Sequence, residues 1–396
     1  MPQSSVPKDI HPENLADWLY HQFFHAYLAA RKHKRSTEDE HKFEINAAEN
    51  IRILVQDVMR REYKPSPGIA FIVLNPVVRE IFAAPFRDRV IHHFIYNMVA
   101  DWWDTRFIQD SYSCRKGKGT LFGIKRLEHH MRSVSNDYKE EAYVIKLDVS
   151  GYFMSLDHDL LYERAMWGLN RQFPDGGELY RILKYLWHEV IYDDPTDGVK
   201  LVSPIKHWEL VPATKCFGCQ PENRGIVIGN LTSQLLSNIF MDQVDRFIKY
   251  HLGYNHYGRY VDDLFIVVPA HQYEQAKRDV KVIENYMNTL HLTLHPKKRV
   301  YRRVDQGIPF LGTVVYPNKL YPDKRFRNNF KEAVWKYKRG FATYDQMISY
   351  IGHMTHLDGD YFISQLFEKN GLEFVMRPIG SPGRAGTQEY GTTHPK

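Results

Sequence analysis

The stretch that decides the fold is Tyr257-Gly258-Arg259-Tyr260-Val261-Asp262-Asp263-Leu264-Phe265-Ile266-Val267-Val268. Its aromatic and β-branched residues favour strands on either side of a tight turn that carries two adjacent aspartates. Neighbouring carboxylates repel each other and interrupt a segment that otherwise favours burial. A bound divalent cation would remove this conflict, whereas a hydrated Asp-Asp turn is the ordinary alternative. On this stretch alone the two interpretations are evenly balanced.

A third carboxylate follows another apolar run. Ala142–Leu147 predicts a strand, and Asp148 comes directly after it, with a further acid at Asp157. We expect this strand and the one after the aspartate pair to lie side by side in one sheet, so that both bring an acid to one point. Carboxylate oxygens are the hard ligands that Mg²⁺ requires. Two ions about 4 Å apart, held by Asp148 and Asp262, would activate a 3′-hydroxyl and stabilise a leaving pyrophosphate.

Length, composition and charge limit the class of protein. At 396 residues, with 43% hydrophobic and 14% aromatic residues, the chain predicts a folded protein of two or three subdomains. Its net charge of +6 is uneven, because residues 291–340 carry 13 Lys and Arg against 3 Asp and Glu. Such a basic segment, with aromatic residues interspersed, suits a polyanion. A well-solvated basic surface is the equally weighted alternative.

The cysteines and the apolar runs indicate in which cellular compartment the protein is expected. Cys114, Cys216 and Cys219 form no disulfide framework, which favours an intracellular, cytoplasmic protein. The last two have metal-type spacing but no second ligand pair nearby, so a structural zinc site is disfavoured. The sequence contains no stretch like a signal peptide and no run of membrane-spanning length. We therefore expect no membrane association.

Periodicity and turn signals predict an α+β chain. Residues 11–65 have a helical pattern, with the charged stretch 31–41 expected to separate two helices. Residues 193–224 are expected to form an ordered insertion. The other predicted elements are strands at 71–74, 80–84, 142–147 and 310–315, the first two around a turn at Asn75-Pro76, and helices at 88–104, 121–133, 225–250, 271–290 and 328–370.

The order of motifs along nearly the whole chain resembles that of reverse transcriptases. This order, and not the aspartate pair alone, favours the metal interpretation. The resemblance implies a right-hand polymerase fold with fingers, an antiparallel-sheet palm and a helical thumb. The series consists of the strand that ends at Asp148, Phe153, the block Gly225–Gln234, Tyr260–Asp263 and Phe310-Leu311-Gly312.

Three blocks resemble more narrowly the reverse transcriptases of diversity-generating retroelements. Ile228–Gln234 matches that family's Ile-Gly-x-x-x-Ser-Gln block, and Arg79-Glu80-Ile81 with Phe86–Val90 matches its fingers. Ser111–Thr120 matches the loop that follows. The resemblance implies an RNA-directed DNA polymerase that makes error-prone, adenine-mutagenic cDNA. The regions it implies are an N-terminal helical segment (1–65), fingers (66–140), a palm (141–317, with the insertion 193–224), a thumb (318–377) and a flexible tail (378–396).

The resemblance also assigns metal and catalytic roles. Asp148 and Asp262 would be the principal ligands of two Mg²⁺ ions, with Asp263 as a nearby charge or secondary ligand. The carbonyl group of Val149 would complete the shell. Lys297 or Lys298 follows His295-Pro296 where the family has a lysine that protonates pyrophosphate, and the sequence does not decide between them.

Five residues are expected to contact the incoming nucleotide. Phe153 would lie beneath the sugar, where a ring collides with a 2′-hydroxyl, although a core aromatic is the ordinary interpretation. Ile228, next to Gly229, replaces a glutamine amide that supports the nascent base pair in many reverse transcriptases, so base-pair checking would be weaker. An ordinary buried side chain is the alternative. Arg79 and Arg87 would grip the triphosphate, unless they pair with Glu80 and Asp88.

Nucleic acid and protein partners complete the expectation. Arg115, Lys116 and Lys118 would approach the template backbone, unless they belong to a flexible basic loop, and Gly312 would admit the primer strand. The implied partners are template RNA, a DNA primer, the cDNA, deoxynucleotides and a small basic accessory protein. An antiphage-defence or other retroelement reverse transcriptase, a metal nuclease and a non-catalytic RNA-binding scaffold remain alternatives.

Overall fold

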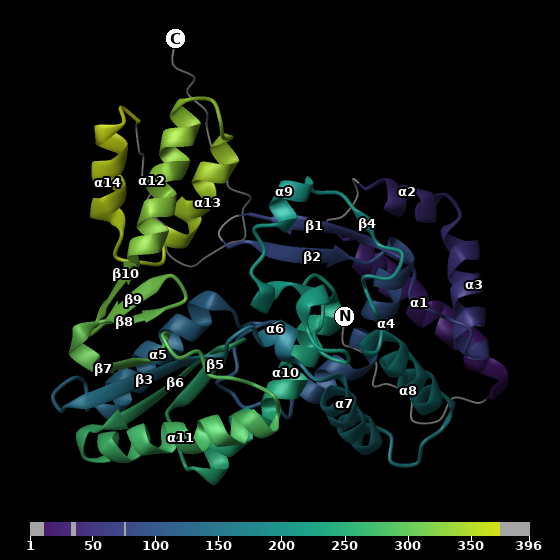
Figure 1. The fold of residues 1–396 in the computed structure, drawn as a ribbon, viewed down its shortest axis with the longest axis horizontal. Coiled ribbons are helices and arrows are strands. Elements are labelled where there is room, and N and C mark those ends of the chain that lie inside the picture. Colours follow the sequence, from purple (N-terminus) through teal and green to yellow (C-terminus); the bar gives the residue numbers. More distant parts are fainter. Residues whose placement is uncertain (1–11, 33–36, 75–76, 373–396) are drawn as a thin grey trace, which may run out of the picture. The chain divides into compact units, whose positions relative to one another are not determined.

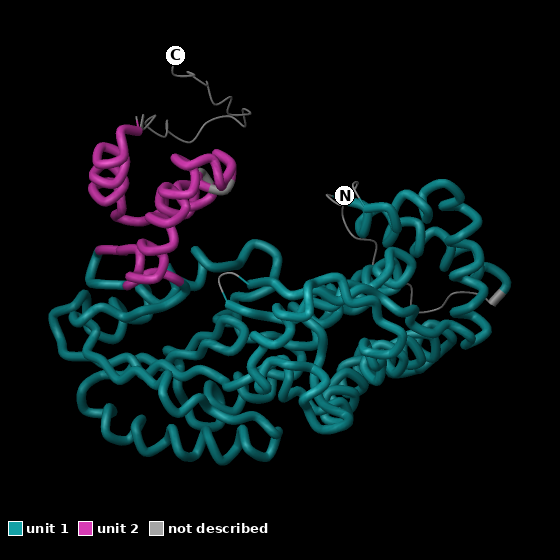
Figure 2. The backbone as a smooth tube through the Cα atoms, turned by 45° about the horizontal axis from the view of Figure 1, so that its top comes forward, with its two compact units in different colours: residues 1–311, 315–318 teal, residues 312–314, 319–396 magenta. Residues whose placement is uncertain are grey.

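The computed structural model describes residues 12–32, 37–74 and 77–372 (Figure 1). The chain divides into two compact units, which Figure 2 distinguishes by colour. Unit 1 comprises residues 1–311 and 315–318, and unit 2 comprises residues 312–314 and 319–396. The predicted turn at Asn75-Pro76 and the predicted tail 378–396 lie outside the described residues.

The central sheet of unit 1 is antiparallel and has the strand order β5-β6-β3-β7. Consecutive residues of β3, such as Val144 and Ile145, are fully buried, so both faces of the sheet are covered. Helices α5 and α11 pack against it. The bounds are β3 Ala142–Asp148, β5 Tyr257–Tyr260, β6 Asp263–Pro269, β7 Val300–Arg303, α5 Thr120–Val134 and α11 Tyr273–Thr289.

A second sheet of unit 1 has the order β2-β1-β4. The first two strands form the expected antiparallel pair, shifted by one or two residues from the prediction. Strand β4 comes from the predicted insertion 193–224 and pairs in parallel with β1. The insertion is therefore ordered and extends this sheet. Its elements and the pair are β1 Ile69–Val73, β2 Arg79–Ala83, β4 Lys200–Leu201 and α9 Ile205–Trp208.

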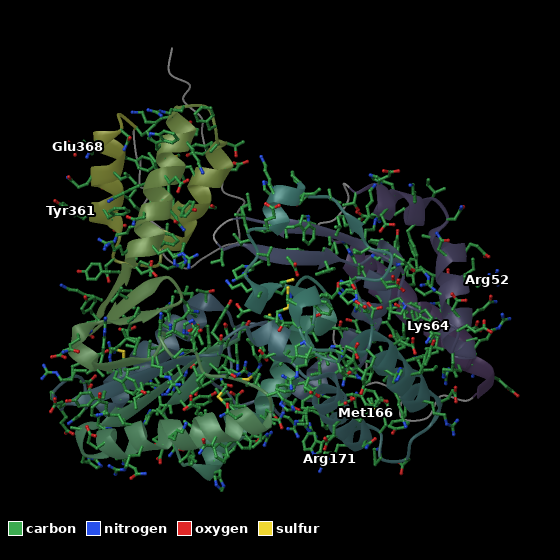
Figure 3. All side chains as sticks on the ribbon, in the orientation of Figure 1. Arg52, Lys64, Met166, Arg171, Tyr361 and Glu368 are labelled. Carbon is green, nitrogen blue, oxygen red and sulfur yellow. The ribbon has the colours of Figure 1, made fainter. Side chains whose placement is uncertain are left out.

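The helical part of unit 1 is organised around α4, which contacts α1, α7, α8 and α10. Aromatic stacking contributes to this core, since the rings of Phe23 and Phe94 lie 4.2 Å apart. The outward faces carry charged side chains such as Arg52 and Arg171 (Figure 3). The helices are α1 Leu15–Arg31, α3 Ala47–Arg60, α4 Phe86–Asp104, α6 Tyr152–Ser155, α7 His158–Gln172, α8 Glu178–Ile191 and α10 Leu231–Arg246.

Three local predictions were wrong. The helix expected from Gly225 begins only at Leu231, because residues 225–230 form an irregular segment whose glycines at 225 and 229 have positive φ angles. The charged stretch 31–41 contains the start of a helix, α2 (Glu38–Ile45), whose three leading acids favour a helix N-terminus. The predicted strand 310–315 is divided into β8 (Ile308–Phe310) and β9 (Thr313–Tyr316). Leu311 and Gly312 between them have φ angles of 51° and 79°, so the chain turns there.

Unit 2 contains a small helical core of its own. Its continuous part starts with β10 (Lys319–Pro322), and the carboxylate of Asp323 then caps the next helix by accepting a hydrogen bond from the Phe326 backbone N–H at 2.6 Å. Phe330 and Val334 are fully buried in this core. The helices are α12 Lys324–Lys338, α13 Tyr344–Met354 and α14 Asp360–Lys369.

We expect Gly168→Ala to lower the stability of the protein. A Cβ atom at Gly168 would lie 2.2 Å from the ring of Trp103, which is buried on α4. Overpacking costs about 1–3 kcal/mol, more than the roughly 1 kcal/mol gained in helix propensity. Gly352→Ala is the matched control, because that helical glycine has open space around it. Thermal unfolding should show a lower Tm for the first variant and not for the second; equal Tm values would contradict this packing.

Candidate active site

The hairpin between β5 and β6 presents Asp262 at its tip. Tyr260 pairs with Asp263, so Val261 and Asp262 form a two-residue turn. Val261 has a φ of 55°, in the left-handed region that β-branched residues avoid. The Asp262 carbonyl accepts a hydrogen bond of 3.2 Å from the backbone N–H of Val149. The surrounding structure therefore holds the turn in a strained conformation against the end of β3.

The sheet register brings the three predicted carboxylates together. Asp148, the last residue of β3, is the register partner of Asp263 on β6. Burial is the main cause that raises the pKa of Asp262 to about 6, and the charges of Asp263 and Asp148 raise it further. Burial also raises the pKa of Asp263, against the opposing effect of Lys146. The turn thus concentrates negative charge in a poorly solvated place.

Two lysines neutralise part of this charge. The Nζ atom of Lys298 donates to both oxygens of Asp148, at 2.8 and 3.0 Å, and Lys146 lies 3.0 Å from Asp263. Lys297 instead uses its backbone N–H to bond the His295 ring at 3.2 Å. The carboxylate of Asp262 has no ion-pair partner among the described residues. Of the two lysine candidates, the structure thus brings Lys298 to the carboxylates.

The donor chemistry of the site fits a hard divalent cation. Three carboxylates converge, and the central one is half-buried beside like charges and forms no ion pair with a described residue, which is the conflict that Mg²⁺ would resolve. The groups do not already enclose a metal position: no cluster of three or more His, Cys, Asp or Glu side chains in the described residues is arranged to hold one. Asp148 and Asp263 are instead paired with Lys298 and Lys146.

Asp157, the further acid noted in the sequence, has a structural role. Its side chain caps α7 by accepting hydrogen bonds from the backbone of Asp159 and Leu160. It also lies 3.8 Å from Arg224 and 3.7 Å from His291. It does not join the carboxylate group at the hairpin.

The residues expected to contact a nucleotide lie on adjoining segments. Phe153 is half-buried on α6, and its carbonyl accepts a 2.9 Å hydrogen bond from the backbone N–H of Ile226. Ile228 and Gly229 follow in the same segment, before α10. A Cβ atom at Gly229 would lie 3.1 Å from the Phe82 carbonyl of β2. The segment after Gly225 therefore runs between α6 and strand β2.

The two candidate arginines differ in their surroundings. Arg87 forms an ion pair of 2.9 Å with Asp57 and one of 3.1 Å with Asp88, and its guanidinium lies over the ring of Tyr63. This is the ion pairing that the sequence left open, and binding a triphosphate would require Arg87 to exchange those partners. Arg79 is exposed at the start of β2.

The basic loop is ordered. Arg115 is only 6% exposed, because it bonds to Asp104 at 2.5 Å and to the carbonyl groups of Ile108 and Ser111. Lys116 is 70% exposed and lies 3.5 Å from Asp101. Arg115 thus braces the loop, and Lys116 presents its charge to solvent.

The two other predicted template contacts lie apart in the chain. The Nζ atom of Lys118 donates to the Gln109 carbonyl at 2.6 Å, and burial lowers the pKa of this lysine to about 8. Gly312 belongs to unit 2 and has a φ of 79°, and a Cβ atom there would lie 4.0 Å from the ring of Phe326, an ordinary contact. Its conformation, in addition to any primer contact, accounts for glycine at this position.

The buried ion pair of Arg259 and Asp245 was not predicted from the sequence. Arg259 is fully buried and forms an ion pair with Asp245 on α10, which is also fully buried. An arginine in an otherwise apolar strand was the available signal, but nothing in the sequence identified its partner.

A comparison with known protein families identifies the family of this chain. The family described as "Reverse transcriptase (RNA-dependent DNA polymerase)" matches residues 77–315, which include all three clustered aspartates. The chain belongs to the reverse transcriptase family. This membership agrees with the α+β right-hand polymerase fold predicted from the sequence, which is confirmed. No helix in the described parts of this reverse transcriptase is long and apolar enough to cross a membrane.

Individual relatives are distant. Protein YkfC of Escherichia coli (strain K12) is 21% identical over 301 residues, which are 67% of this chain and 71% of YkfC. Telomerase of Candida tropicalis with a fragment of telomeric RNA has a TM-score of 0.47 at 11% identity and matches 78% of this chain. The apo enzyme truncated from its C-terminal domain has a TM-score of 0.46 at 12% identity and matches 65%. In both cases the match spans 56% of the telomerase chain.

We expect Lys298→Met to tighten the binding of Mn²⁺, used as a spectroscopic substitute for Mg²⁺. The lysine competes with a cation for the oxygens of Asp148. It is 58% exposed, so the pair is worth at most about 1 kcal/mol, and the gain should be about two- to fivefold. Lys297→Met is the matched control and should bind as the wild type does. Electron paramagnetic resonance titration measures both; weaker binding by Lys298→Met would contradict this arrangement.

The pH dependence of the same titration tests Asp262. Because a proton and a cation compete for its carboxylate, whose pKa is about 6, Mn²⁺ affinity should fall as the pH is lowered from 7.5 to 5.5. The fall should approach tenfold per pH unit below pH 6 if one proton is displaced. Asp262→Asn should bind more weakly and show a flatter profile. A wild-type affinity that stays constant down to pH 5.5 would contradict the raised pKa.

Proposed function

We propose that this reverse transcriptase copies a retroelement template RNA into DNA by two-metal-ion nucleotidyl transfer, and that it is inaccurate opposite template adenine. The observation that carries the catalytic part is the β3–β6 register, which sets Asp148 against the Asp262-Asp263 turn. Carboxylates delivered by two paired strands can hold two hard cations at a fixed separation. Membership of the reverse transcriptase family supports RNA as template.

The residues at the aspartate turn would have distinct roles in catalysis. Asp148, Asp262 and the Val149 carbonyl would hold Mg²⁺, which when bound supplies Lewis-acid activation of the 3′-hydroxyl and charge stabilisation at the pyrophosphate. Asp263, paired with Lys146, contributes charge nearby. Lys298 keeps Asp148 neutralised until a cation replaces its ammonium group. Its Nζ atom, already at the site, would then carry the proton given to pyrophosphate.

Nucleotide selection would come from adjoining segments. The half-buried ring of Phe153 would exclude a 2′-hydroxyl by its volume. Arg79 would bind the triphosphate, joined by Arg87 once it leaves Asp57. Ile228 offers no hydrogen bond to a nascent base pair, so mispairs would meet little resistance. The resemblance of the Ile228–Gln234 block to diversity-generating retroelements is what supports adenine-directed errors and a small basic accessory protein as partner.

A primer-extension assay with an RNA template, a DNA primer and Mg²⁺ tests the catalytic proposal. We expect the wild type to add deoxynucleotides and Asp262→Asn to be at least about 10³-fold slower, because a metal ligand is lost. Asp157→Asn is the matched control, since asparagine caps a helix as well as aspartate does and should retain activity within about threefold. Absence of incorporation by the wild type would contradict the proposal and favour an RNA-binding scaffold. Equal activity in Asp262→Asn would contradict the assigned ligand.

Sequencing the cDNA made on a defined template tests the accuracy proposal. Ile228→Gln should lower misincorporation opposite adenine by about fivefold, as expected for one restored hydrogen bond of about 1 kcal/mol. Val227→Gln places the same side chain one residue earlier, also at a half-buried position, and should leave the error rate unchanged. An unchanged error rate in Ile228→Gln would sink the adenine-mutagenic assignment while leaving the polymerase assignment intact.

A further inference from the structure

Among the residues that the structure describes, the most deeply buried cation belongs to Arg259, beside the aspartate turn. Arg259 on β5 is fully buried, and its Nε and Nη2 atoms donate to the two carboxylate oxygens of Asp245, both at 2.8 Å. The hydroxyl group of Tyr257 donates to the same carboxylate at 2.6 Å. Taking both charges out of water is costly, and well-packed apolar residues often serve stability equally well. The other hydrogen-bond donors of Arg259 indicate a role besides stability.

One of those donors holds the aspartate turn itself. The Nη1 atom of Arg259 donates to the carbonyl of Val261 at 3.0 Å. Val261 is the residue in the left-handed conformation, and Asp262 follows it directly. A forked guanidinium can bond Asp245 and this carbonyl simultaneously, whereas the single ammonium group of a lysine cannot reproduce that fork. The ion pair therefore fixes the conformation from which the Asp262 carboxylate projects.

The same residue fixes the segment that leads into the basic loop. The backbone N–H of Arg259 donates to the Asp110 carbonyl at 2.8 Å, and its carbonyl accepts from the Tyr112 N–H at 3.0 Å. Its Nη2 atom donates to the Ser111 hydroxyl at 3.1 Å. Asn238, beside the guanidinium at 3.3 Å, donates to the Ser113 carbonyl at 2.9 Å. A single buried network thus joins residues 110–113 to the aspartate turn.

We infer that Arg259, held by Asp245, is a positioning residue that sets Asp262 for nucleotide addition and couples the turn to the loop of Arg115, Lys116 and Lys118. The inference rests on the proposed polymerase function. Arg259 is fully buried and so has no surface to offer a substrate, and it acts through its hydrogen bond to Val261. A displacement of about 1 Å in a reacting group can cost about 10²-fold in rate, which sets the size of the expected effect.

The test compares two arginines that each pair with a buried aspartate of α10. Arg259→Lys should lower kcat for single-nucleotide addition about 100-fold, with the KM for deoxynucleotide within about threefold, and should raise the Mg²⁺ concentration needed for half-maximal rate. Arg164→Lys is the control: Arg164 bonds fully buried Asp242 at 2.5 Å, on the face toward α7. It should leave kcat within about threefold. Both are assayed well below their Tm.

A second substitution separates positioning from stability. Glycine adopts the left-handed conformation at no steric cost, so Val261→Gly added to Arg259→Lys should recover about tenfold in kcat, without restoring the Tm that the ion pair provided. If Arg259→Lys does not fold, Asn238→Ala is measured instead, since it keeps the Arg259–Asp245 ion pair, removes the bonds to Ser113 and to the guanidinium, and should lower kcat about tenfold. An unchanged kcat in Asn238→Ala would overturn the coupling to the loop.

Three results are distinguishable. A loss in Arg259→Lys no greater than that in Arg164→Lys, or a loss confined to KM, overturns the positioning role. Absence of rescue by Val261→Gly overturns the route through the turn. Absence of nucleotide addition by the wild-type protein contradicts the proposed function itself and is read before any variant is compared.

Discussion

The pairing of β3 with β6 is the constraint on which the rest of the site depends. Side chains alternate along a strand, so a shift of one residue would turn every apolar side chain of β3 to the opposite face. The observed register places Asp148 opposite Asp263, and burial on both faces of the sheet makes other registers costly. The core of unit 1 therefore sets the positions of Asp148 and Asp263. The turn that carries Asp262 lies against the end of β3, whose position the same core determines.

Charge balance is the second condition. A turn with two adjacent carboxylates beside a third is unfavourable unless cations compensate it. Lys298 pairs with Asp148, and Lys146 pairs with Asp263. Arg259 holds the backbone of the turn through its hydrogen bond to the Val261 carbonyl. Asp262 is the carboxylate left without an ion-pair partner among the described residues, and burial together with the charges of Asp263 and Asp148 raises its pKa. This asymmetry is what makes the site receptive to a divalent cation.

The sequence predicted those features that depend on local pattern. Apolar strands ending in acids, helical periodicity and the order of the motifs were sufficient for the fold class and for the approach of Asp148 to Asp262 and Asp263. Features that depend on partners distant in the chain were missed. Strand β7 was not predicted, because Val300-Tyr301-Arg302-Arg303 is basic and becomes a strand only by pairing with β3. The division at Leu311 and the partner of Arg259 likewise come from tertiary packing.

Partners distant in the chain also explain why the role of a residue is harder to predict than its place in the fold. Arg87 and Arg115 have the composition of phosphate-binding residues, yet both are engaged by acids or carbonyl groups of the protein. Lys297 and Lys298 are equivalent in sequence, and only the structure shows which one reaches Asp148. The sequence shows that a basic residue in a motif could bind phosphate. The structure shows which acids or carbonyl groups already bind that residue and would have to be released first.

The most direct measurement is a crystal structure of the protein with an RNA template, a DNA primer, an incoming deoxynucleotide and Ca²⁺, which binds carboxylate oxygens. We expect cations bound jointly by Asp148 and Asp262, in contact with the triphosphate, with Lys298 displaced from Asp148 and Arg259 still bonded to Val261. A complex in which Lys298 remains on Asp148 and the cations lie away from both aspartates would contradict this expectation.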